Sequence, residues 1–398
     1  MKKEIWIHID SYRPNGNAPA NRAFAFAKFF SNQGYKINVI TIGKEDRVDC
    51  REEATVYYIK DKWHFKKKNL INRLLDNITF SRKTLSFIKR NKNVISNSFF
   101  LVSVPEYIAG SSCIKAKRYG AMLITDIRDI WPEVAIEMGI FKSDSLKAKI
   151  FKHYAQKYYK NSDYIFTVSK RKTEYLQTLT NHTNDEKVVW VGNGFDIDTL
   201  ALEADDSILQ QYDLKDKFVI SYAGNVGKAQ HLISLLEYAK KVNGLTNDIF
   251  IIAGNGGELD NLKQYSKDNK LTNTIFTGTV TKEQAKAITC SSNVSFIPLS
   301  SDKMLDSVPT KLFESLGLGV PVILVANGES VDILNESQFG LSVLPSNINQ
   351  IDDVFSSFKK QYSSIIGRKE IAVKLMQTKY SRQKYCGDFE KIISEHVG

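Results

Sequence analysis

Residues 306 to 324 read Asp306-Ser307-Val308-Pro309-Thr310-Lys311-Leu312-Phe313-Glu314-Ser315-Leu316-Gly317-Leu318-Gly319-Val320-Pro321-Val322-Ile323-Leu324. The Ser-x-Pro start predicts a helix, and the Gly-x-Pro turn predicts an apolar strand directly after it. The free N–H groups in the first turn of such a helix can bind a phosphate. Glu314 lies about two turns further on and can accept hydrogen bonds from the hydroxyl groups of a ribose.

Apolar runs on both sides of this segment predict two series of alternating strands and helices. The second series has strand candidates at 218–224, 248–253, 274–278, 294–298 and 321–325. The first series has candidates at 5–9, 36–42, 99–104, 122–126, 164–168 and 188–191. Such alternation is typical of parallel sheets covered by helices. A chain of 398 residues is long for one core, so we expect two α/β domains joined by a polar linker at 198–217.

Several smaller features bound the class of protein. The helix predicted at 20–33 carries Phe24, Phe26, Phe29 and Phe30, which we expect to pack on the first sheet. The cysteines at 50, 113, 290 and 386 are far apart, which indicates reduced, buried thiols in a cytosolic protein. No uncharged apolar run reaches about 20 residues, so we expect no membrane-spanning helix and only peripheral membrane contact. The short apolar run after Met1 predicts a strand, not a signal peptide.

The formal net charge of +11 is concentrated in residues 60–92, which hold eleven Lys or Arg against two Asp. Aromatic and aliphatic residues alternate with these charges at helical spacing. Three interpretations stay open: a helix packed on its own domain with a solvated basic rim, a segment that docks on an anionic membrane, and a nucleic-acid contact. The residues that we assign to membrane contact are Lys62, Trp63, Phe65, Lys66, Lys67 and Lys68.

Ligands of parallel sheets bind beyond the carboxyl ends of the strands, so the loops that follow the strands are candidate sites. In the second domain, Gly224 and Asn225 follow the first strand, and Lys228 stands where a cation can meet a diphosphate. Gly254 and Asn255 follow the next strand in a similar turn. Neither loop has the spacing of a Walker sequence.

The first domain has its own candidate loops. The loop after its first strand contains Gly16 and Asn17 and leads into a helix N-terminus, where an anion or a polar sugar can bind. A second loop, Thr125 to Glu133, follows a buried strand and contains four charged residues and a tryptophan. Its Asp129 and Glu133 are candidates for a cleft site, while the structural alternative pairs Arg128 with Asp126 or Asp129. The turn at 192–196 has two glycines, and its structural and functional interpretations stay open.

Taken together, these loops resemble glycosyltransferase family four, the large family of retaining enzymes with the GT-B fold. The resemblance rests on residues 14–22, 126–133, 168–170, 192–196, 222–225 and 309–321. It is nearest to the bacterial surface-polysaccharide branch that includes N-acetyl-fucosaminyl transferases. The resemblance implies two facing Rossmann-like domains with a cleft between them. Residues 1–200 would bind the acceptor, residues 215–377 the nucleotide-sugar, and helices at about 378–398 would return to the first domain.

The resemblance also implies roles for single residues. In the family two acids eight residues apart contact the sugar and the ribose, and Asp306 and Glu314 have this spacing, although Asp306 is one methylene shorter than the usual Glu. Asn225 stands where relatives have an Arg, Lys228 and Gln230 are alternative matches to the phosphate-binding Lys, and Lys311 can add positive charge. The donor-binding residues predicted in this way are Gly16, Asn17, Gly224, Asn225, Lys228, Gly254, Asn255, Ser307, Val308, Pro309, Thr310, Lys311 and Glu314.

The implied reaction is a front-face displacement with retention, in which no protein nucleophile and no metal or other cofactor takes part. Lys228, Asp306 and Asp129 are the predicted catalytic residues, and Arg128, Asp129 and Glu133 form the predicted acceptor side. We expect a UDP-linked N-acetylated hexosamine or deoxyhexosamine as donor and a lipid-linked saccharide of O-antigen or capsule synthesis as acceptor, at the inner face of the cytoplasmic membrane. The alternatives are a nucleotide-sugar epimerase of the same fold and a non-enzymatic basic protein that binds nucleic acid.

Overall fold

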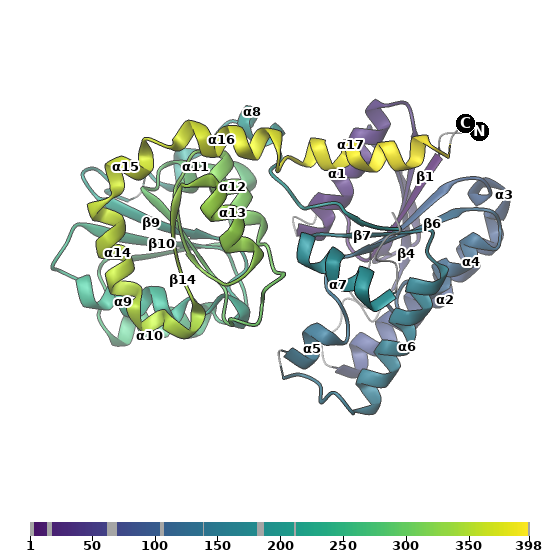
Figure 1. Ribbon diagram of the computed structural model, residues 1–398, viewed down its shortest axis with the longest axis horizontal. Helices are drawn as coiled ribbons and strands as arrows, with labels where there is room; N and C mark the ends of the chain where they lie inside the picture. Colours follow the sequence, from purple (N-terminus) through teal and green to yellow (C-terminus); the bar gives the residue numbers. More distant parts are fainter. Residues whose placement is uncertain are drawn as a thin grey trace. The chain divides into compact units, whose positions relative to one another are not determined.

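The computed structural model of the chain describes residues 4–13, 18–61, 70–103, 107–137, 139–180, 187–210 and 212–396 (Figure 1). The chain forms two units, each with its own sheet. Unit 1 contains Met1–Asn193 together with Tyr385–Gly398, and unit 2 contains Gly194–Lys384. The segment 198–217, which we predicted as a linker, falls within unit 2.

Unit 1 is built on an eight-stranded sheet with the order β3-β4-β2-β1-β5-β6-β7-β8. All neighbouring strands are parallel except the pair of β3 and β4, which is antiparallel. The strands are β1 (Glu4–Ile9), β2 (Lys36–Gly43), β3 (Arg47–Cys50), β4 (Thr55–Lys60), β5 (Phe99–Ser103), β6 (Met122–Ile127), β7 (Tyr164–Thr167) and β8 (Val188–Trp190). The strand order reverses between β1 and β5, so the loops after these two strands diverge there.

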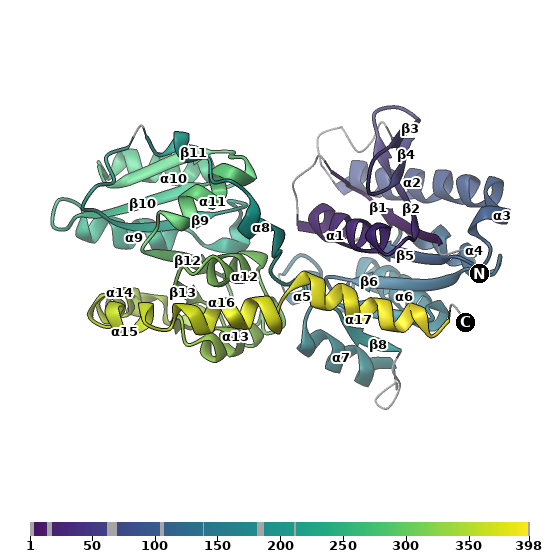
Figure 2. The same ribbon diagram turned by 90° about the horizontal axis from the view of Figure 1, so that it is seen from above.

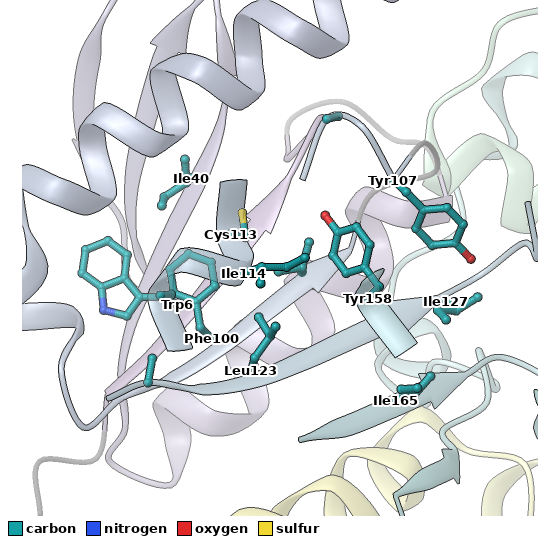
Figure 3. Close-up of a cluster of buried hydrophobic side chains, with 14 of the residues drawn as sticks. Trp6, Ile40, Phe100, Tyr107, Cys113, Ile114, Leu123, Ile127, Tyr158 and Ile165 are labelled. Carbon is teal, nitrogen blue, oxygen red and sulfur yellow. The ribbon is translucent and has the colours of Figure 1, made fainter. Parts of the chain in front are cut away.

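Helices cover both faces of this sheet (Figures 1 and 2). On one face α1 (Ala18–Asn32) packs beside α17 (Arg382–Ser394), because Phe389 contacts the rings of Phe26 and Phe30. The other face holds a larger cluster, whose rings and aliphatic chains include Trp6, Phe100, Leu123 and Tyr158 (Figure 3). The helices on or near that face are α2 (Leu70–Arg90), α3 (Lys92–Ile95), α4 (Ile114–Lys117), α5 (Glu133–Glu137), α6 (Leu146–Asn161) and α7 (Lys170–Thr180), with a 3-10 turn η1 (Ser111–Cys113).

Unit 2 has a six-stranded, fully parallel sheet with the order β11-β10-β9-β12-β13-β14. Its strands are β9 (Phe218–Ala223), β10 (Asp248–Ala253), β11 (Thr274–Gly278), β12 (Val294–Pro298), β13 (Val322–Val325) and β14 (Gly340–Val343). This is the doubly wound order of dinucleotide-binding domains, and the order reverses between β9 and β12. The carboxyl ends of β9 and β12 are therefore the place where a ligand of this unit is expected.

The helices of unit 2 fill both faces of its sheet (Figure 2). On one face Tyr238 and Phe355 stack with their ring centres 4.1 Å apart and hold two helices together. The helices and 3-10 turns are α8 (Asp198–Ala201), η2 (Asp206–Ile208), η3 (Lys228–Gln230), α9 (Ile233–Val242), α10 (Leu259–Asp268), α11 (Lys282–Cys290), α12 (Thr310–Gly317), α13 (Glu329–Ser337), η4 (Pro345–Gln350), α14 (Ile351–Lys360), α15 (Tyr362–Ile366) and α16 (Lys369–Thr378).

The structure confirms the predicted α/β class and corrects several details. Three strands were not predicted: β3, β4 and β14. Cys113 and Cys386 are buried as expected, whereas Cys50 and Cys290 are exposed, since they lie in an edge strand and at a helix end. Phe26 and Phe30 are core residues, and Phe24 and Phe29 pack against the core while partly exposed. Among the described residues, no helix combines the length and apolarity needed to cross a membrane.

Candidate active site

In unit 2 two glycine-rich loops run side by side where β9 and β10 end. We call residues 224–227 and 254–257 the glycine loops. Their backbones are joined by bonds from Gly224 N to Ala253 O (2.8 Å) and from Val226 N to Asn255 O (2.9 Å). A Cβ atom on Gly254 would lie 1.8 Å from Gly224 O, and one on Gly256 would lie 2.1 Å from Val226 O. Glycine is therefore required for this close approach, and the loops present backbone without side chains to a ligand.

The loop after β12 closes the other side of this region. Ser300 N donates to Ala229 O at 3.0 Å, which ties the loop after β12 to the loop after β9. Further along, Ser330 donates its hydroxyl proton to Ser307 O at 2.5 Å, and Glu329 N donates to Leu305 O at 2.9 Å. These bonds fix residues 305–307 directly before α12.

Helix α12 begins at this point without a side-chain cap. Its N-cap residue is Pro309, which cannot supply one, so the N–H groups of Thr310 and Lys311 have no partner within the helix. Asp306, Ser307 and Val308 are partly exposed in the preceding loop. The carboxylate of Glu314, one turn into α12, accepts no hydrogen bond from any residue that the structure describes. The helix start thus offers an anion site with a hydrogen-bond acceptor beside it.

Lys311 reaches from α12 toward the carboxyl end of β9. Its ammonium group lies 2.5 Å from the Tyr222 hydroxyl and 3.9 Å from the centre of that ring. Burial lowers the pKa of Lys311 to about 7, and the charge of Glu314 opposes this shift. Tyr222 in turn donates its hydroxyl proton to Asn225 O, and burial raises the pKa of this phenol. Lys311 makes no ion pair with the described carboxylates, so its charge is available to an anion.

The two alternative matches for a phosphate-binding lysine differ in their surroundings. Lys228 is exposed at the start of η3 and forms no ion pair with a residue described in the structure. The Gln230 side chain accepts from Gly227 N at 3.1 Å and from the Asn225 amide at 3.3 Å. Gln230 therefore holds the first glycine loop in shape, while Lys228 remains open to solvent. Asn225 and Asn255 are also exposed.

In unit 1 a buried ion pair organises the residues at the carboxyl end of β6. Arg22, from α1, binds Asp126 through two of its nitrogens at 2.8 and 3.1 Å. The same guanidinium donates to Val191 O and Gly192 O, each at 2.7 Å, just before the chain leaves unit 1. The structural alternative paired Arg128 with Asp126 or Asp129, and its pairing with Asp126 is wrong because Arg22 binds both oxygens of that carboxylate.

The predicted acceptor-side residues lie in the loop that follows. Asp129 is exposed, whereas Arg128 is partly buried, and its Nε and one terminal nitrogen have no hydrogen-bond partner among the described residues. Glu133 begins α5, and burial raises its pKa while Lys152 partly offsets the shift. Glu133 and Lys152 line a cavity of about 440 Å³ between α6 and the end of α7. Its other lining residues are Pro132, Ala155, Gln156, Tyr159, Lys160, Leu179, Thr180 and Lys187.

Some predicted residues fall outside what the structure describes. These are Gly16 and Asn17 of the donor set and Lys62, Trp63, Phe65, Lys66, Lys67 and Lys68 of the membrane set. The described part of the basic segment is α2, which packs Phe80 and Ile88 into the core and exposes Leu74 and Ile78. The described parts of the chain contain no group of three or more His, Cys, Asp or Glu side chains that could hold a metal ion.

Sequence reasoning missed two residues of these sites, Tyr222 and Arg22. Both had a visible signal: Tyr222 directly precedes the first glycine loop at the end of a strand, and Arg22 is the one charged residue among the alanines and phenylalanines at 20–27. Neither signal identifies the residue that Tyr222 or Arg22 contacts, because Lys311 is 89 residues from Tyr222 and Asp126 is 104 residues from Arg22.

Comparisons with known proteins agree with this arrangement. Residues 204–370 match the family model described as glycosyl transferases group 1. The probable glycosyltransferase WbjE of Pseudomonas aeruginosa is 19% identical over 225 residues, which is 56% of this chain and 56% of that protein.

Solved structures extend the similarity to the whole chain. Sucrose-phosphate synthase from Thermosynechococcus elongatus superposes with a TM-score of 0.80 at 10% identity, covering 100% of this chain and 99% of that one. HepE from Anabaena, solved with UDP-glucose, gives 0.71 at 13% identity over 98% and 99% of the two chains. WaaG, a glycosyltransferase of lipopolysaccharide biosynthesis, gives 0.72 at 12% identity over 97% and 99%. Residues 204–370 therefore resemble the glycosyl transferases group 1 family, and the chain shares the GT-B fold of these solved structures.

Proposed function

We propose that the chain is a retaining glycosyltransferase that transfers a sugar from a UDP-linked donor to a lipid-linked saccharide. The observation that carries this proposal is the convergence of the glycine loops, Lys311 and the uncapped start of α12 at the carboxyl ends of β9 and β12. A diphosphate fits these groups because they combine free N–H donors with an ammonium group that has no carboxylate partner.

The main donor residues of unit 2 have separate parts in this mechanism. The glycine loops and the N–H groups of Thr310 and Lys311 bind the diphosphate, and Glu314 accepts hydrogen bonds from the ribose. Negative charge grows on the leaving diphosphate as the glycosidic bond breaks, and Lys228 and Lys311 stabilise it. Asp306 contacts the hydroxyl groups of the transferred sugar. Because UDP and UDP-glucose occupy HepE, a protein of the same fold, UDP is the nucleotide to test first.

The acceptor side of the proposal rests on unit 1. Asp129 is exposed after β6 and orients the acceptor hydroxyl, whose proton passes to this carboxylate or to the leaving phosphate. Arg128 and Glu133 flank the acceptor. The proposed sugar is an N-acetylated hexosamine or deoxyhexosamine. The proposed acceptor belongs to O-antigen or capsule synthesis. WaaG, a glycosyltransferase of lipopolysaccharide biosynthesis with a similar fold, supports this class of acceptor. The proposed location is the inner face of the cytoplasmic membrane.

The alternatives gain no support from the relatives named above. A nucleotide-sugar epimerase would release an altered free sugar without an acceptor. A nucleic-acid-binding protein would leave the glycine loops and the free acceptor at Glu314 without a use.

The test is thermal stabilisation by UDP, GDP, ADP and CMP, with and without magnesium. Saturation at about 100 times Kd adds about 2.7 kcal/mol to the stability of the binding domain. We expect one diphosphate to stabilise the wild type without magnesium and Glu314→Ala to lose most of this effect. The matched control is Glu237→Ala, an exposed glutamate of α9. No stabilisation by any nucleotide would reject the proposal.

A further inference from the structure

Tyr222 places a buried hydroxyl group near the carboxyl end of β9, beside the point where the strand order of unit 2 reverses. The side chain is 1% exposed, and a phenylalanine ring would fill the same space. Packing therefore does not require the hydroxyl group, and burying it without hydrogen bonds would be costly. Its contribution lies in the hydrogen bonds that it makes.

These hydrogen bonds fix the direction of the hydroxyl group. It donates its proton to Asn225 O, in the first glycine loop. The oxygen then remains as an acceptor, and the Lys311 ammonium group lies 2.5 Å from it. Lys311 is therefore the donor in this contact. An acceptor at this distance favours the protonated, charged form of Lys311 over the neutral amine.

The same contact places the ammonium group against the first glycine loop. Lys311 Nζ lies 2.8 Å from the position that a Cβ atom on Gly224 would occupy, so the ammonium group fills the space beside this glycine. In the next residue, Asn225 N donates to no residue that the structure describes. The loop and α12 thus offer an N–H group and an ammonium group at neighbouring residues. Such a pair matches the negatively charged oxygens of a diphosphate.

Tyr222 is the main support that Lys311 has from outside its own helix. Glu314, also on α12, is the charged group among the described residues that acts on Lys311, and it raises the pKa of this side chain against the effect of burial. From β9 the support is neutral, because the ring of Tyr222 lies 3.9 Å from the ammonium group and its hydroxyl accepts the hydrogen bond. Phenylalanine at this position would keep the ring contact and lose the hydrogen bond.

We propose that Tyr222 is a positioning residue for the diphosphate of the donor, because its hydroxyl group holds the Lys311 ammonium group beside the first glycine loop. This inference rests on the proposed function and extends it, since it gives Tyr222 a role that acts through Lys311. The alternative is a structural role, in which the hydroxyl group only completes the hydrogen bonding of the loop through Asn225 O. The two roles differ in whether loss of the hydroxyl group requires Lys311 to take effect.

The experiment is calorimetric titration of the full chain with UDP-glucose at pH 7.5. The proteins compared are the wild type, Tyr222→Phe, Lys311→Met and the double variant. We expect Tyr222→Phe to weaken the affinity about tenfold, the effect of one hydrogen bond to a charged group. In the Lys311→Met background the same change weakens it less than about twofold, because the ammonium group is already absent. A structural role predicts the same fold-loss in both backgrounds.

A second readout follows Lys311 in the free protein by nuclear magnetic resonance. With isotopically labelled lysine, the Cε signal that is absent from Lys311→Arg belongs to Lys311, and its shift with pH gives the pKa. Burial lowers this pKa to about 7 in the wild type. Tyr222→Phe lowers it further, because the charged form loses an acceptor. The affinity for UDP-glucose then begins to fall at a lower pH than in the wild type. An unchanged pKa in Tyr222→Phe overturns the inference.

The matched control is Tyr238→Phe, which removes the hydroxyl group of a buried tyrosine of α9 in the same unit. If the inference is correct, this variant retains the wild-type affinity and the wild-type pKa of Lys311. An equal loss in Tyr238→Phe, wild-type affinity in Tyr222→Phe, or an equal fold-loss in both backgrounds of Lys311 overturns the inference.

Inorganic pyrophosphate separates this inference from the proposed function. If the wild type binds pyrophosphate but no nucleotide-sugar, the transferase is rejected, and weaker pyrophosphate binding by Tyr222→Phe retains Tyr222 as a positioning residue for a diphosphate. If UDP-glucose binds Tyr222→Phe as tightly as the wild type, the inference fails and the transferase is retained. A wild type that binds neither compound overturns both.

Discussion

The ammonium group of Lys311 lies over the ring of Tyr222, 3.9 Å from its centre, and donates to the hydroxyl of the same residue. A lysine buried in this way is held by an aromatic face and a neutral oxygen in place of a carboxylate. The lowered pKa means that a large fraction of the Lys311 side chains is uncharged near pH 7 in the free protein. A bound anion favours the protonated, charged form. Four predictions rest on this pair, on the glycine loops, on the ion pair of Arg22 with Asp126, and on the buried His8.

We expect the affinity for UDP-glucose, the proposed donor, to depend on pH through Lys311. The pKa of Lys311 is lowered to about 7, so the side chain is charged below pH 7 and must take up a proton to bind a diphosphate above it. Affinity is highest below pH 7 and falls above it, by up to about tenfold per pH unit. The experiment uses UDP-glucose in place of UDP, because UDP has a terminal phosphate with a pKa of ~6 whose own titration would interfere.

Calorimetric titration at pH 7.5 in two buffers of different ionisation enthalpy measures this proton uptake. Lys311→Arg keeps its charge at all these pH values, so its affinity stays flat between pH 7 and 9. The same slope in both proteins would show that another group takes up the proton.

Gly254→Ala destabilises unit 2 and removes nucleotide binding. Its φ is +132°, and the added Cβ would lie 1.8 Å from Gly224 O, so the two glycine loops must separate. We expect a loss of more than about 1 kcal/mol, measured by calorimetric unfolding. Gly257→Ala is the matched control in the same loop, because nothing lies within 4 Å of its added Cβ. If both variants lose binding equally, the close approach of the loops is not the cause.

Arg22→Met destabilises unit 1 by about 3–5 kcal/mol, because it leaves the buried Asp126 carboxylate without its partner. The double variant Arg22→Met with Asp126→Asn recovers part of this loss, since the buried charge is then absent. Urea unfolding followed by tryptophan fluorescence measures it, and all four tryptophans lie in unit 1. A double variant less stable than Arg22→Met would contradict this explanation.

Unit 1 loses stability in acid through His8. This buried side chain stacks on Phe80 and shares a hydrogen bond with Thr84, and burial lowers its pKa from 6.5 to about 3. Below pH 6.5 the unfolded chain binds a proton that the folded chain does not, so stability falls toward pH 3, by up to about 1.4 kcal/mol per pH unit. His8→Gln removes this contribution, and its stability in urea at pH 7, 6 and 5 falls less steeply. Parallel profiles for the two proteins would exclude His8 as the source.

The sequence predicts most of this fold because parallel strands buried on both faces are continuous apolar runs. Strands such as β9 and β10 have this property. The strands β3 and β14 do not, because they are four residues long, lie at sheet edges and expose much of their surface. Their formation depends on the neighbouring strand and leaves little trace in the local sequence.

The candidate site likewise contains residues that the sequence predicts and contacts that it does not. The glycine loops are predictable because a close backbone approach requires glycine at fixed places after a strand. The contacts of Lys311 with Tyr222 and of Arg22 with Asp126 join residues about a hundred positions apart, and only the sheet order brings them together. The alternative that paired Arg128 with Asp126 failed for this reason, because it considered only neighbours in the sequence and left out Arg22 of α1.

Helix α17 carries the chain back to unit 1, where Phe389 packs against Phe26, Phe30 and Phe166. Unit 2 is therefore an insertion within unit 1. On the ribosome, unit 2 is complete before the segment that contains Phe389 has been synthesised. The core around Phe26 and Phe30 stays incomplete until then, so unit 1 cannot reach its native packing before the whole of unit 2 has been synthesised.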